Sequence, residues 1–322
     1  MNRQRVLLSS LDNMVFIILA VVFLFFGALI GGPFMSTHNL LFILYISSLL
    51  APMVLAEGIC LISGNFDLSV AEIAGLSAMF TASMTVTGLC PPFLSVPLIL
   101  VSGSILGAVN GFFVGRLGLN PFLVTLSTNI MYQWFIYVVR QNTVTSLPAS
   151  FIYLGAESIF GIQVVVPFMI IVSLVLSVVM RKTRFGNYVY AVGGNPQAAT
   201  MLGINSKGIV FAVFVISGFF SGMTGLLYAG FVQSVSVELT NGLVFTAFAG
   251  AVLGGISLKG GSGKISNAYG GIVLMGTIQA GSHMLLLPPE WVGILTGGLI
   301  LGAILLNQAR EKIRKRLLMP VE

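Results

Sequence analysis

Charged side chains are scarce in this sequence. Lysine, arginine, aspartate and glutamate together make up 7% of the 322 residues, whereas hydrophobic residues make up 57% and the mean hydropathy is +1.03. A soluble domain of this length carries far more charge, so the composition excludes that class and indicates a polytopic membrane protein. The net charge of +6 does not indicate nucleic-acid binding, because the cations lie in short loops and near the ends of the chain.

Cysteine and histidine are also scarce, with two of each. Cys60 and Cys90 provide no disulfide framework, and His38 and His283 have no acidic residues at metal-ligand spacing. The GGSGK run at 260–264 lacks the spacing of a phosphate-binding loop and predicts a tight turn instead. No Ser-His-Asp or Cys-His set can be assembled. We therefore expect no catalytic residue, no metal site and no cofactor, and we expect that the chain is not an enzyme.

About ten apolar stretches are long enough, or nearly so, to cross a bilayer as helices of about 20 residues. The first resembles a signal peptide, but its apolar run is too long for one, so we expect a retained span. The fold class is therefore predicted to be all-α, a polytopic membrane protein with about 10 transmembrane helices in a single domain over residues 1–322. The stretches cover residues 14–31, 40–63, 68–88, 93–116, 121–139, 162–180, 208–230, 243–257, 265–282 and 291–306.

The positive-inside rule predicts the orientation of these spans. With the N-terminus in the cytoplasm and ten spans, only Arg140 of the 15 lysines and arginines falls outside. Arg3 and Arg5 fall inside, as does the basic C-terminal tail. We expect both termini and the loop at 181–208 to be cytoplasmic.

The sequence also contains an internal similarity. GxxDLS at 64–69 and GxxSLK at 254–259 are 190 residues apart, from 64 to 254, and chance similarity is the alternative explanation. The offset relates span two to span seven or span eight. A five-span shift would make the repeat inverted, as is common in transporters, and we predict an inverted internal repeat. The same offset relates Gly103 to Gly293 and Gly107 to Gly297.

The longest polar segment between two apolar stretches runs from Arg181 to Gly208. Asn195 can cap a helix whose first residue is Pro196, and Gly203 can end it. A helix of about two turns is marginal in water and needs something to pack against. The segment is either an ordinary ordered loop or a docking element for a partner on the same side of the membrane.

Acidic residues gather at the boundary between the second and third spans, at Glu57, Asp67 and Glu72. Acids inside a membrane are costly and are candidates for function. Asp67 precedes the third span, where capping of that helix is the favoured interpretation. Two interpretations stay open for Glu57: a residue of a transport pathway, or a hydrogen-bonding partner of a neighbouring helix.

Glycines recur at every fourth position in the fourth span. Such a strip lets another helix backbone approach closely, within one chain or between subunits, and packing within the chain is favoured. The strip consists of Gly103, Gly107, Gly111 and Gly115.

Three segments resemble one known family. They are ISGNFDLSV at 62–70, YAVGGNPQAA at 190–199 with LGI at 202–204, and VLGGISL at 252–258 with GGSG at 260–263. In this order they are similar to the membrane permease subunits of bacterial ATP-binding-cassette (ABC) importers of the ribose and simple-sugar type. The first segment is close to the family's GGIDLSVG, and branched-chain amino-acid permeases are distant relatives of this family.

The sequence departs from the family pattern in places. Asn65-Phe66 replaces the usual Gly-Ile, 71–72 lacks a Gly-Ser-like pair, and Glu57 stands where the family is apolar or small. These departures affect the prediction of the substrate and not that of the fold. The Asp-Leu-Ser run at 67–69 fits the sugar branch better than the amino-acid branch.

The resemblance implies a permease that moves a sugar or sugar-like solute across the bacterial cytoplasmic (inner) membrane by alternating access. It implies that ATP is hydrolysed on a separate ABC ATPase subunit, that a second permease subunit, identical or related, completes the pathway, and that a periplasmic or lipid-anchored binding protein delivers the solute. Structural or pathway candidates are Glu57, Gly64, Asp67 and Ser69. The coupling helix to the ATPase would comprise Asn195, Pro196, Gln197, Ala198, Ala199, Leu202 and Gly203.

Two other functions compete with this interpretation. An ion-coupled secondary transporter would usually carry several acids, histidines or cations along its spans. Here only Glu57, Asp67 and Glu72 could serve. A membrane-embedded enzyme would need a catalytic constellation, and none can be assembled from the sequence.

Overall fold

The computed structural model describes residues 14–318, apart from the side chains of residues 289, 303, 306, 307 and 309–318. Arg3 and Arg5 therefore lie outside the described residues. The longer helices are α2 (Met14–Ile30), α3 (Thr37–Ile62), α4 (Val70–Val86), α5 (Ser95–Gly111), α6 (Pro121–Val139), α8 (Val165–Lys182), α11 (Ser206–Val232), α13 (Ile265–Met284) and α14 (Pro289–Leu318). The shorter ones are η1 (Pro92–Leu94), the π-helical turn η2 (Phe112–Arg116), α7 (Ala149–Ala156), α9 (Arg184–Gly194), α10 (Pro196–Met201) and α12 (Leu243–Leu253).

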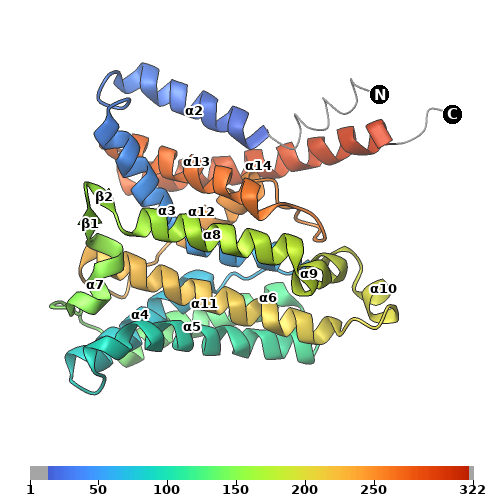
Figure 1. Cartoon of the computed structure of the whole chain (residues 1–322), viewed down its shortest axis with the longest axis horizontal. Helices are drawn as coiled ribbons and strands as arrows, with labels where there is room; N and C mark the ends of the chain where they lie inside the picture. The colour runs from blue at the N-terminus through green and yellow to red at the C-terminus, as the bar shows by residue number, and fades with distance from the viewer. Residues whose placement is uncertain (1–13, 319–322) are drawn as a thin grey trace.

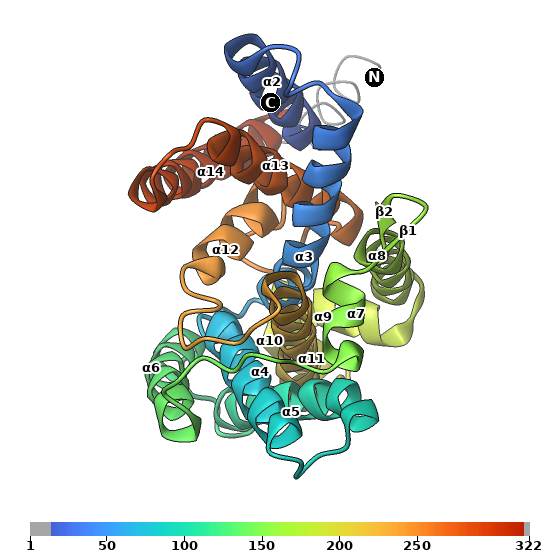
Figure 2. The same cartoon turned by 90° about the vertical axis from the view of Figure 1, so that its left-hand side faces the viewer.

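The molecule is a bundle of helices with different connections at its two ends. Figure 1 shows α10 and the far end of α14 at one end. At the opposite end lie α7 and an antiparallel hairpin of β1 (Ser158–Ile159) and β2 (Ile162–Gln163). Figure 2 views the bundle from this second end, with α12 between α14 on one side and α4 and α6 on the other.

Each of the ten predicted apolar stretches overlaps one of these helices. Within the described residues, five helices are long and apolar enough to cross a membrane: α3, η1 with α5 and η2, α6, α8 and α11. Shorter apolar helices cover Met14–Ile30, Val70–Val86, Leu243–Leu253 and Glu290–Gly302. The prediction of a helical, polytopic membrane protein is therefore confirmed, whereas the count of ten spans stays a prediction.

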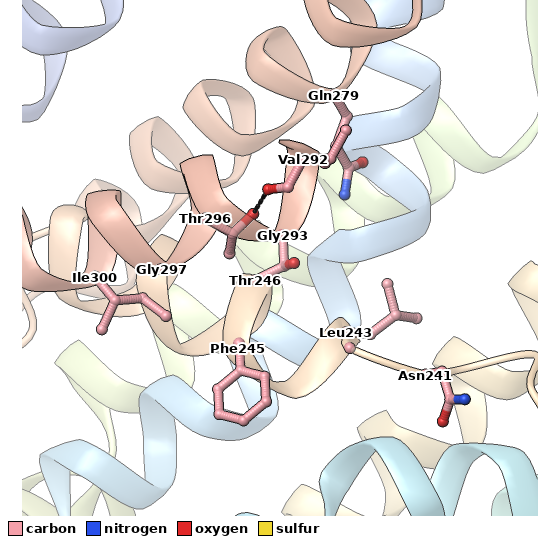
Figure 3. Close-up of a pocket in the computed structure, with 11 residues that line it drawn as sticks. Asn241, Leu243, Phe245, Thr246, Gln279, Val292, Gly293, Thr296, Gly297 and Ile300 are labelled. Atoms are coloured by element: carbon pink, nitrogen blue, oxygen red, sulfur yellow. Dashed lines mark hydrogen bonds between the residues drawn. The ribbon is translucent and has the colours of Figure 1, made fainter. Parts of the chain in front are cut away.

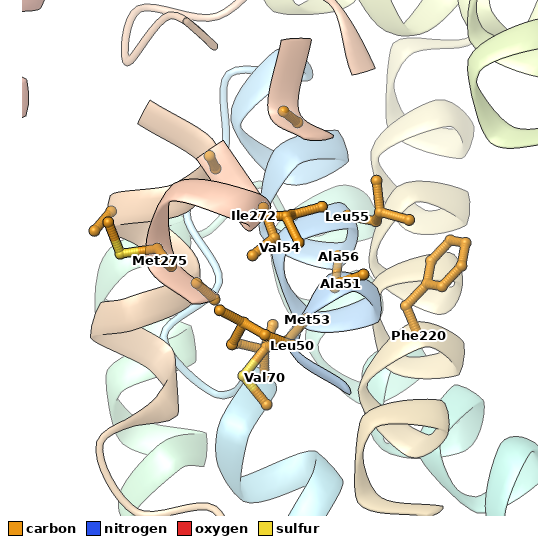
Figure 4. Close-up of a cluster of buried hydrophobic side chains, with 14 of the residues drawn as sticks. Leu50, Ala51, Met53, Val54, Leu55, Ala56, Val70, Phe220, Ile272 and Met275 are labelled. Carbon is orange, nitrogen blue, oxygen red and sulfur yellow. The ribbon is translucent and has the colours of Figure 1, made fainter. Parts of the chain in front are cut away.

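Helix α3 occupies the centre of the bundle. Every residue from Ser47 to Ser63 is buried, and α3 contacts α8, α11, α12 and α13. Figure 4 shows side chains of α3, such as Leu50 and Val54, among those of α11 and α13. A helix that is apolar on all sides is expected where neighbouring helices cover it completely.

Helix α5 packs along α11 through glycine. A methyl group at Gly103 would overlap the carbonyl oxygen of Gly218, and one at Gly107 would overlap that of Phe214. Gly111 and Gly115 lie against the backbone of Phe211 in the same way. The glycine strip thus packs within the chain, which confirms the favoured interpretation, and lets the two backbones approach closely.

We expect Gly107→Val to destabilise the α5–α11 contact. The added side chain would overlap backbone atoms, which cannot rotate away as a side chain can. The expected loss is about 1–3 kcal/mol or more of unfolding free energy, the usual cost of overpacking. Thermal unfolding in detergent measures it. Gly302→Val is the matched control, because nothing lies within 4 Å of a Cβ at that position in α14. Equal unfolding temperatures for the two variants would contradict the assignment.

Candidate functional site

Helix α10 forms as the sequence predicts, and capping explains why so short a helix is ordered. The Asn195 side-chain oxygen accepts hydrogen bonds from the backbone N–H groups of Gln197 (3.1 Å) and Ala198 (3.0 Å). Pro196 is its first residue, and Gly203 follows it with a φ of +82°. The hydroxyls of Thr200 and Ser206, 2.8 Å apart, then join α10 to the start of α11.

The C-terminal end of α10 exposes two large apolar side chains. Met201 is 88% exposed and Leu202 is 81% exposed, and both lie at the tip of the turn. Ala199 is only 2% exposed, so it packs against the chain itself. Of the predicted coupling residues, Asn195, Pro196, Gln197, Ala198, Leu202 and Gly203 are thus open to a partner, and Ala199 is not.

A second helix that the sequence analysis does not predict precedes α10. Helix α9 (Arg184–Gly194) ends with Gly193 and Gly194, although glycine has a poor propensity for helix. The Tyr190 hydroxyl donates a hydrogen bond to the carbonyl of Gly263 (2.8 Å). Burial raises the pKa of the Tyr190 phenol above its ordinary value, so it remains a neutral donor at physiological pH. This contact ties α9 to the loop before α13.

The end of α9 meets two other segments at what we call the glycine junction, made of Gly64, Gly193, Gly260 and Gly261. A side chain at Gly193 would overlap the carbonyl oxygen of Ile62 and crowd the amide of Gly261. The Gly261 N–H donates to the same Ile62 carbonyl (2.8 Å). A Cβ at Gly260 would meet Gly64 and Gly193. The three segments that carry the family resemblance therefore converge at one point, backbone against backbone.

Asp67 lies next to this junction, in the break between α3 and α4, and is fully buried. Its Oδ1 accepts from the Ser69 hydroxyl (2.6 Å) and the Ser69 N–H (3.1 Å), so Asp67 caps the turn at 68–69 that precedes α4, whereas the N-cap residue of α4 itself is Ser69. Its Oδ2 accepts from the Ser217 hydroxyl (2.9 Å) on α11. The Ser69 hydroxyl accepts in turn from the Asn110 amide (2.7 Å) on α5. Asp67 thus both caps a turn and joins three elements.

Glu57 is also buried, at 1% exposure, on α3. Neither of its carboxyl oxygens has a hydrogen-bond partner within the described residues. A bond to a neighbouring helix, one of the two interpretations of this residue, is therefore absent from the described part of the chain. Glu72 lies in the first turn of α4, where the helix dipole favours an acid.

Sequence reasoning missed the polar residues that hold the break in place. Ser217, Asn110 and Asn129 come from α11, α5 and α6. The Asn129 amide donates to the carbonyl of Leu68 (2.8 Å). For Asn110 and Ser217 the signal in the sequence is a polar residue in an apolar run, which is typical of a helix-to-helix hydrogen bond in a membrane, whereas Asn129 follows Ser127 and Thr128 and does not stand out.

The structure corrects one inference about the internal repeat. The breaks at 63–69 and 254–264, which the 190-residue offset relates, lie against each other at the glycine junction. Helices α3 and α12 both end at this junction and therefore run in the same direction, whereas equivalent helices of inverted copies run in opposite directions. The motif offset does not by itself identify an inverted repeat, and the inverted repeat stays a prediction.

Comparisons with known proteins agree on one family. The family model described as "Branched-chain amino acid transport system / permease component" matches residues 39–304. The D-allose transport system permease protein of Escherichia coli (strain K12) is 34% identical over 300 residues, which cover 92% of this chain and 91% of the relative. The fructose import permease protein of Rhizobium meliloti is 29% identical over 321 residues (96% and 89%).

A ribose import permease protein, from Haemophilus influenzae, is 29% identical over 283 residues (86% of this chain and 87% of the relative). These relatives are similar over nearly their full length, so the resemblance is not confined to the three motifs. No solved structure matches the chain.

Substitutions at the adjacent Gly193 and Gly194 should differ in their effect on stability, because only a Cβ at Gly193 would make a close contact within the glycine junction. Gly193→Ala should lower the free energy of unfolding by about 1–3 kcal/mol, because the methyl group would overlap the Ile62 carbonyl. Gly194→Ala should be neutral or slightly stabilising, because its Cβ would meet only the Gly261 Cα at 3.9 Å and alanine favours the helix. Thermal unfolding in detergent compares the two. A destabilised Gly194→Ala beside an unaffected Gly193→Ala would refute the packing.

Proposed function

Because the chain belongs to the family of permease components described for branched-chain amino acid transport systems, we propose that it is the membrane-spanning subunit of an ATP-driven importer of a sugar or sugar-like solute. As a transport subunit it is not an enzyme. ATP is hydrolysed on a separate ABC ATPase, and alternating access carries the solute across the bacterial cytoplasmic (inner) membrane.

The observation that carries this proposal is the geometry of α10. A capped, six-residue helix presents Met201 and Leu202 to the outside at one end of the bundle (Figure 1). Large exposed apolar side chains on a polar loop fit burial in a partner protein. Through α9 and the glycine junction, α10 is joined to the break beside Asp67. We therefore assign α10 as the coupling helix that docks on the ATPase.

The relatives support a sugar as the solute. The names of the three relatives concern D-allose, fructose and ribose, whereas the family description concerns branched-chain amino acids. The Asp-Leu-Ser run at 67–69 fits the sugar branch as well. We propose a monosaccharide or a similar neutral solute.

The proposed topology has ten spans in a single permease domain over residues 1–322, with both termini and the coupling loop at 181–208 in the cytoplasm. The near-absence of cations from the outer loops supports it. For the inverted repeat we propose the five-span shift, which relates α3 to α11. Both are long and largely buried, and they run in opposite directions, since α3 ends and α11 begins near the α9–α10 segment.

The proposed assembly contains further proteins. A second permease subunit, identical or related, would enclose the pathway, and a periplasmic or lipid-anchored binding protein would deliver the solute. The comparisons fit this ATP-driven importer and do not fit the ion-coupled alternative.

Replacing the exposed tip of α10 should detach the ATPase. In the double variant Met201→Asp/Leu202→Asp, two charges stand where the partner's cleft would bury apolar surface. We expect at least a tenfold lower yield of ATPase co-purified with the tagged chain, with the permease still monodisperse in mild detergent.

Phe160→Asp is the control, because Phe160 is 102% exposed in the β1–β2 hairpin at the opposite end. It should keep the ATPase. Ala199 is unsuitable as a docking test, because a bulky side chain there would disturb the packing of α10 itself. Full ATPase recovery with the double variant would remove the docking assignment.

Glu57→Gln distinguishes the two modes of coupling. If ATP drives transport, this isosteric change removes no hydrogen bond of the described structure and should keep uptake within about twofold of the wild type. The assay uses proteoliposomes with the ATPase and the binding protein, with D-allose, D-fructose, D-ribose and L-leucine as probes. Uptake without ATP under a proton gradient, abolished by Glu57→Gln in a folded protein, would establish the ion-coupled alternative instead.

A further inference from the structure

A cavity of about 500 Å³ lies between α12, α13 and α14 (Figure 3). Its volume is within the range of about 300–1,000 Å³ that is typical of small-molecule sites. Among the described residues that line it, none has an acidic or basic side chain. Its walls are mostly apolar, with Asn241 before α12, Thr246 on α12, Gln279 on α13 and Thr296 on α14 as the polar side chains.

Three of these polar side chains have no hydrogen-bond partner in the part of the chain that the structure describes. Within the residues that the structure describes, the Asn241 and Gln279 amides and the Thr246 hydroxyl make no hydrogen bond to another part of the chain. Asn241 is exposed, Gln279 is half-buried and Thr246 is buried, and a polar group that is removed from water without a hydrogen bond is costly. These groups are therefore placed to bind something that enters the cavity.

The two threonines of the cavity, Thr246 and Thr296, differ in whether their hydroxyl is already hydrogen-bonded. The Thr296 hydroxyl donates to the carbonyl of Val292 in its own helix (2.8 Å), and Thr277 does the same to Val273 (2.8 Å). This is the usual way in which a threonine satisfies its hydroxyl in an apolar helix. Thr246 makes no such bond, although its side chain is 92% buried, so its hydroxyl stays available to the cavity.

The chemistry of the lining selects a neutral, polyhydroxylated molecule. Amide and hydroxyl groups can both donate to and accept from sugar hydroxyls. The Phe245 ring, 57% exposed at the cavity, offers an apolar surface for the face of a sugar ring. A zwitterionic amino acid would need charged partners for its ammonium and carboxylate, and this lining provides none.

We propose that the cavity between α12, α13 and α14 is where this chain contacts its solute during passage, with Gln279 and Thr246 hydrogen-bonding the hydroxyls of a monosaccharide and Phe245 packing on its ring. The inference rests on the proposed function and adds to it the location of the contact and the residues that determine specificity. The contacts are few, which suits a permease that has to release its solute.

The test compares two isosteric substitutions in the same cavity. Thr246→Val removes an available hydroxyl, whereas Thr296→Val removes one that is already bonded within its helix. In proteoliposomes with the ATPase and the binding protein, uptake of the best-transported probe sugar should fall about tenfold with Thr246→Val, the loss of about one hydrogen bond. Gln279→Leu should act similarly, and Thr296→Val should stay within about twofold.

ATPase activity without sugar should be unchanged in all three variants, which shows that folding and docking are intact. Normal uptake by both Thr246→Val and Gln279→Leu would overturn the inference while leaving the proposed function in place. A wild-type protein that takes up no sugar with ATP would instead overturn the proposed function. A changed oligomeric mass with normal uptake would assign the cavity to a contact between copies and overturn the inference.

A thiol-protection measurement tests the same site independently of transport rate. Asn241→Cys introduces a reactive group at the cavity, on a background in which Cys60 and Cys90 are free but buried. A water-soluble maleimide should label this variant, and the probe sugar at saturating concentration should slow labelling about tenfold, because a bound sugar would cover the thiol. Labelling that is unaffected by every transported sugar would contradict the proposal.

Discussion

Residues 63–69 form a non-helical break between α3, which is buried at the centre of the bundle, and α4. The backbone N–H and C=O groups that lose their helical partners at this break have to form hydrogen bonds within the protein. In a bilayer, water is not available for this task. Segments distant in the sequence supply the partners: the Gly261 N–H bonds the Ile62 carbonyl, and the Asn129 amide bonds the Leu68 carbonyl. The Asp67 carboxylate accepts a hydrogen bond from the Ser217 hydroxyl of α11. The positions of α6, α11 and the loop before α13 thus all depend on this break.

Glycine serves two purposes in this architecture. Along α5 it brings two straight helices together over several turns, as in many membrane helix pairs. At the glycine junction it brings together three chain segments that change direction, where Gly64, Gly260 and Gly261 also have positive φ angles. Because backbone meets backbone there, no flexible side chain separates the α9–α10 segment from the break. A displacement of α10 by a partner therefore has a short, stiff route to the centre of the bundle.

Local chemistry made part of this structure predictable from the sequence. Asn195 and Pro196 define the start of α10 because capping and a fixed φ act within a few residues. The apolar stretches locate the helices for a similar reason. Helix α9 was missed because Gly193 and Gly194 have poor helix propensity, which tertiary packing overrides where only glycine fits.

Other features depend on information that is not local. The sequence does not show which side of a six-residue helix faces the protein, so Ala199 was grouped with the exposed residues of α10. The cavity at α12 combines Thr246, Gln279 and Thr296 from three helices, and no spacing in the sequence relates them. The partnership of Asp67 with Ser217, 150 residues away, could not be inferred for the same reason.

The convergence at the glycine junction constrains how such permeases can be recombined. The segments 62–70, 190–204 and 252–263 are far apart in the sequence but share one close-packed contact. A chimaera that exchanges only one of them with a relative keeps its fit only if the incoming segment also brings glycine to the positions of contact. Exchange of a coupling segment between transporters thus depends on packing inside the permease as well as on the surface of α10, and the glycines are the first positions to align when such hybrids are planned.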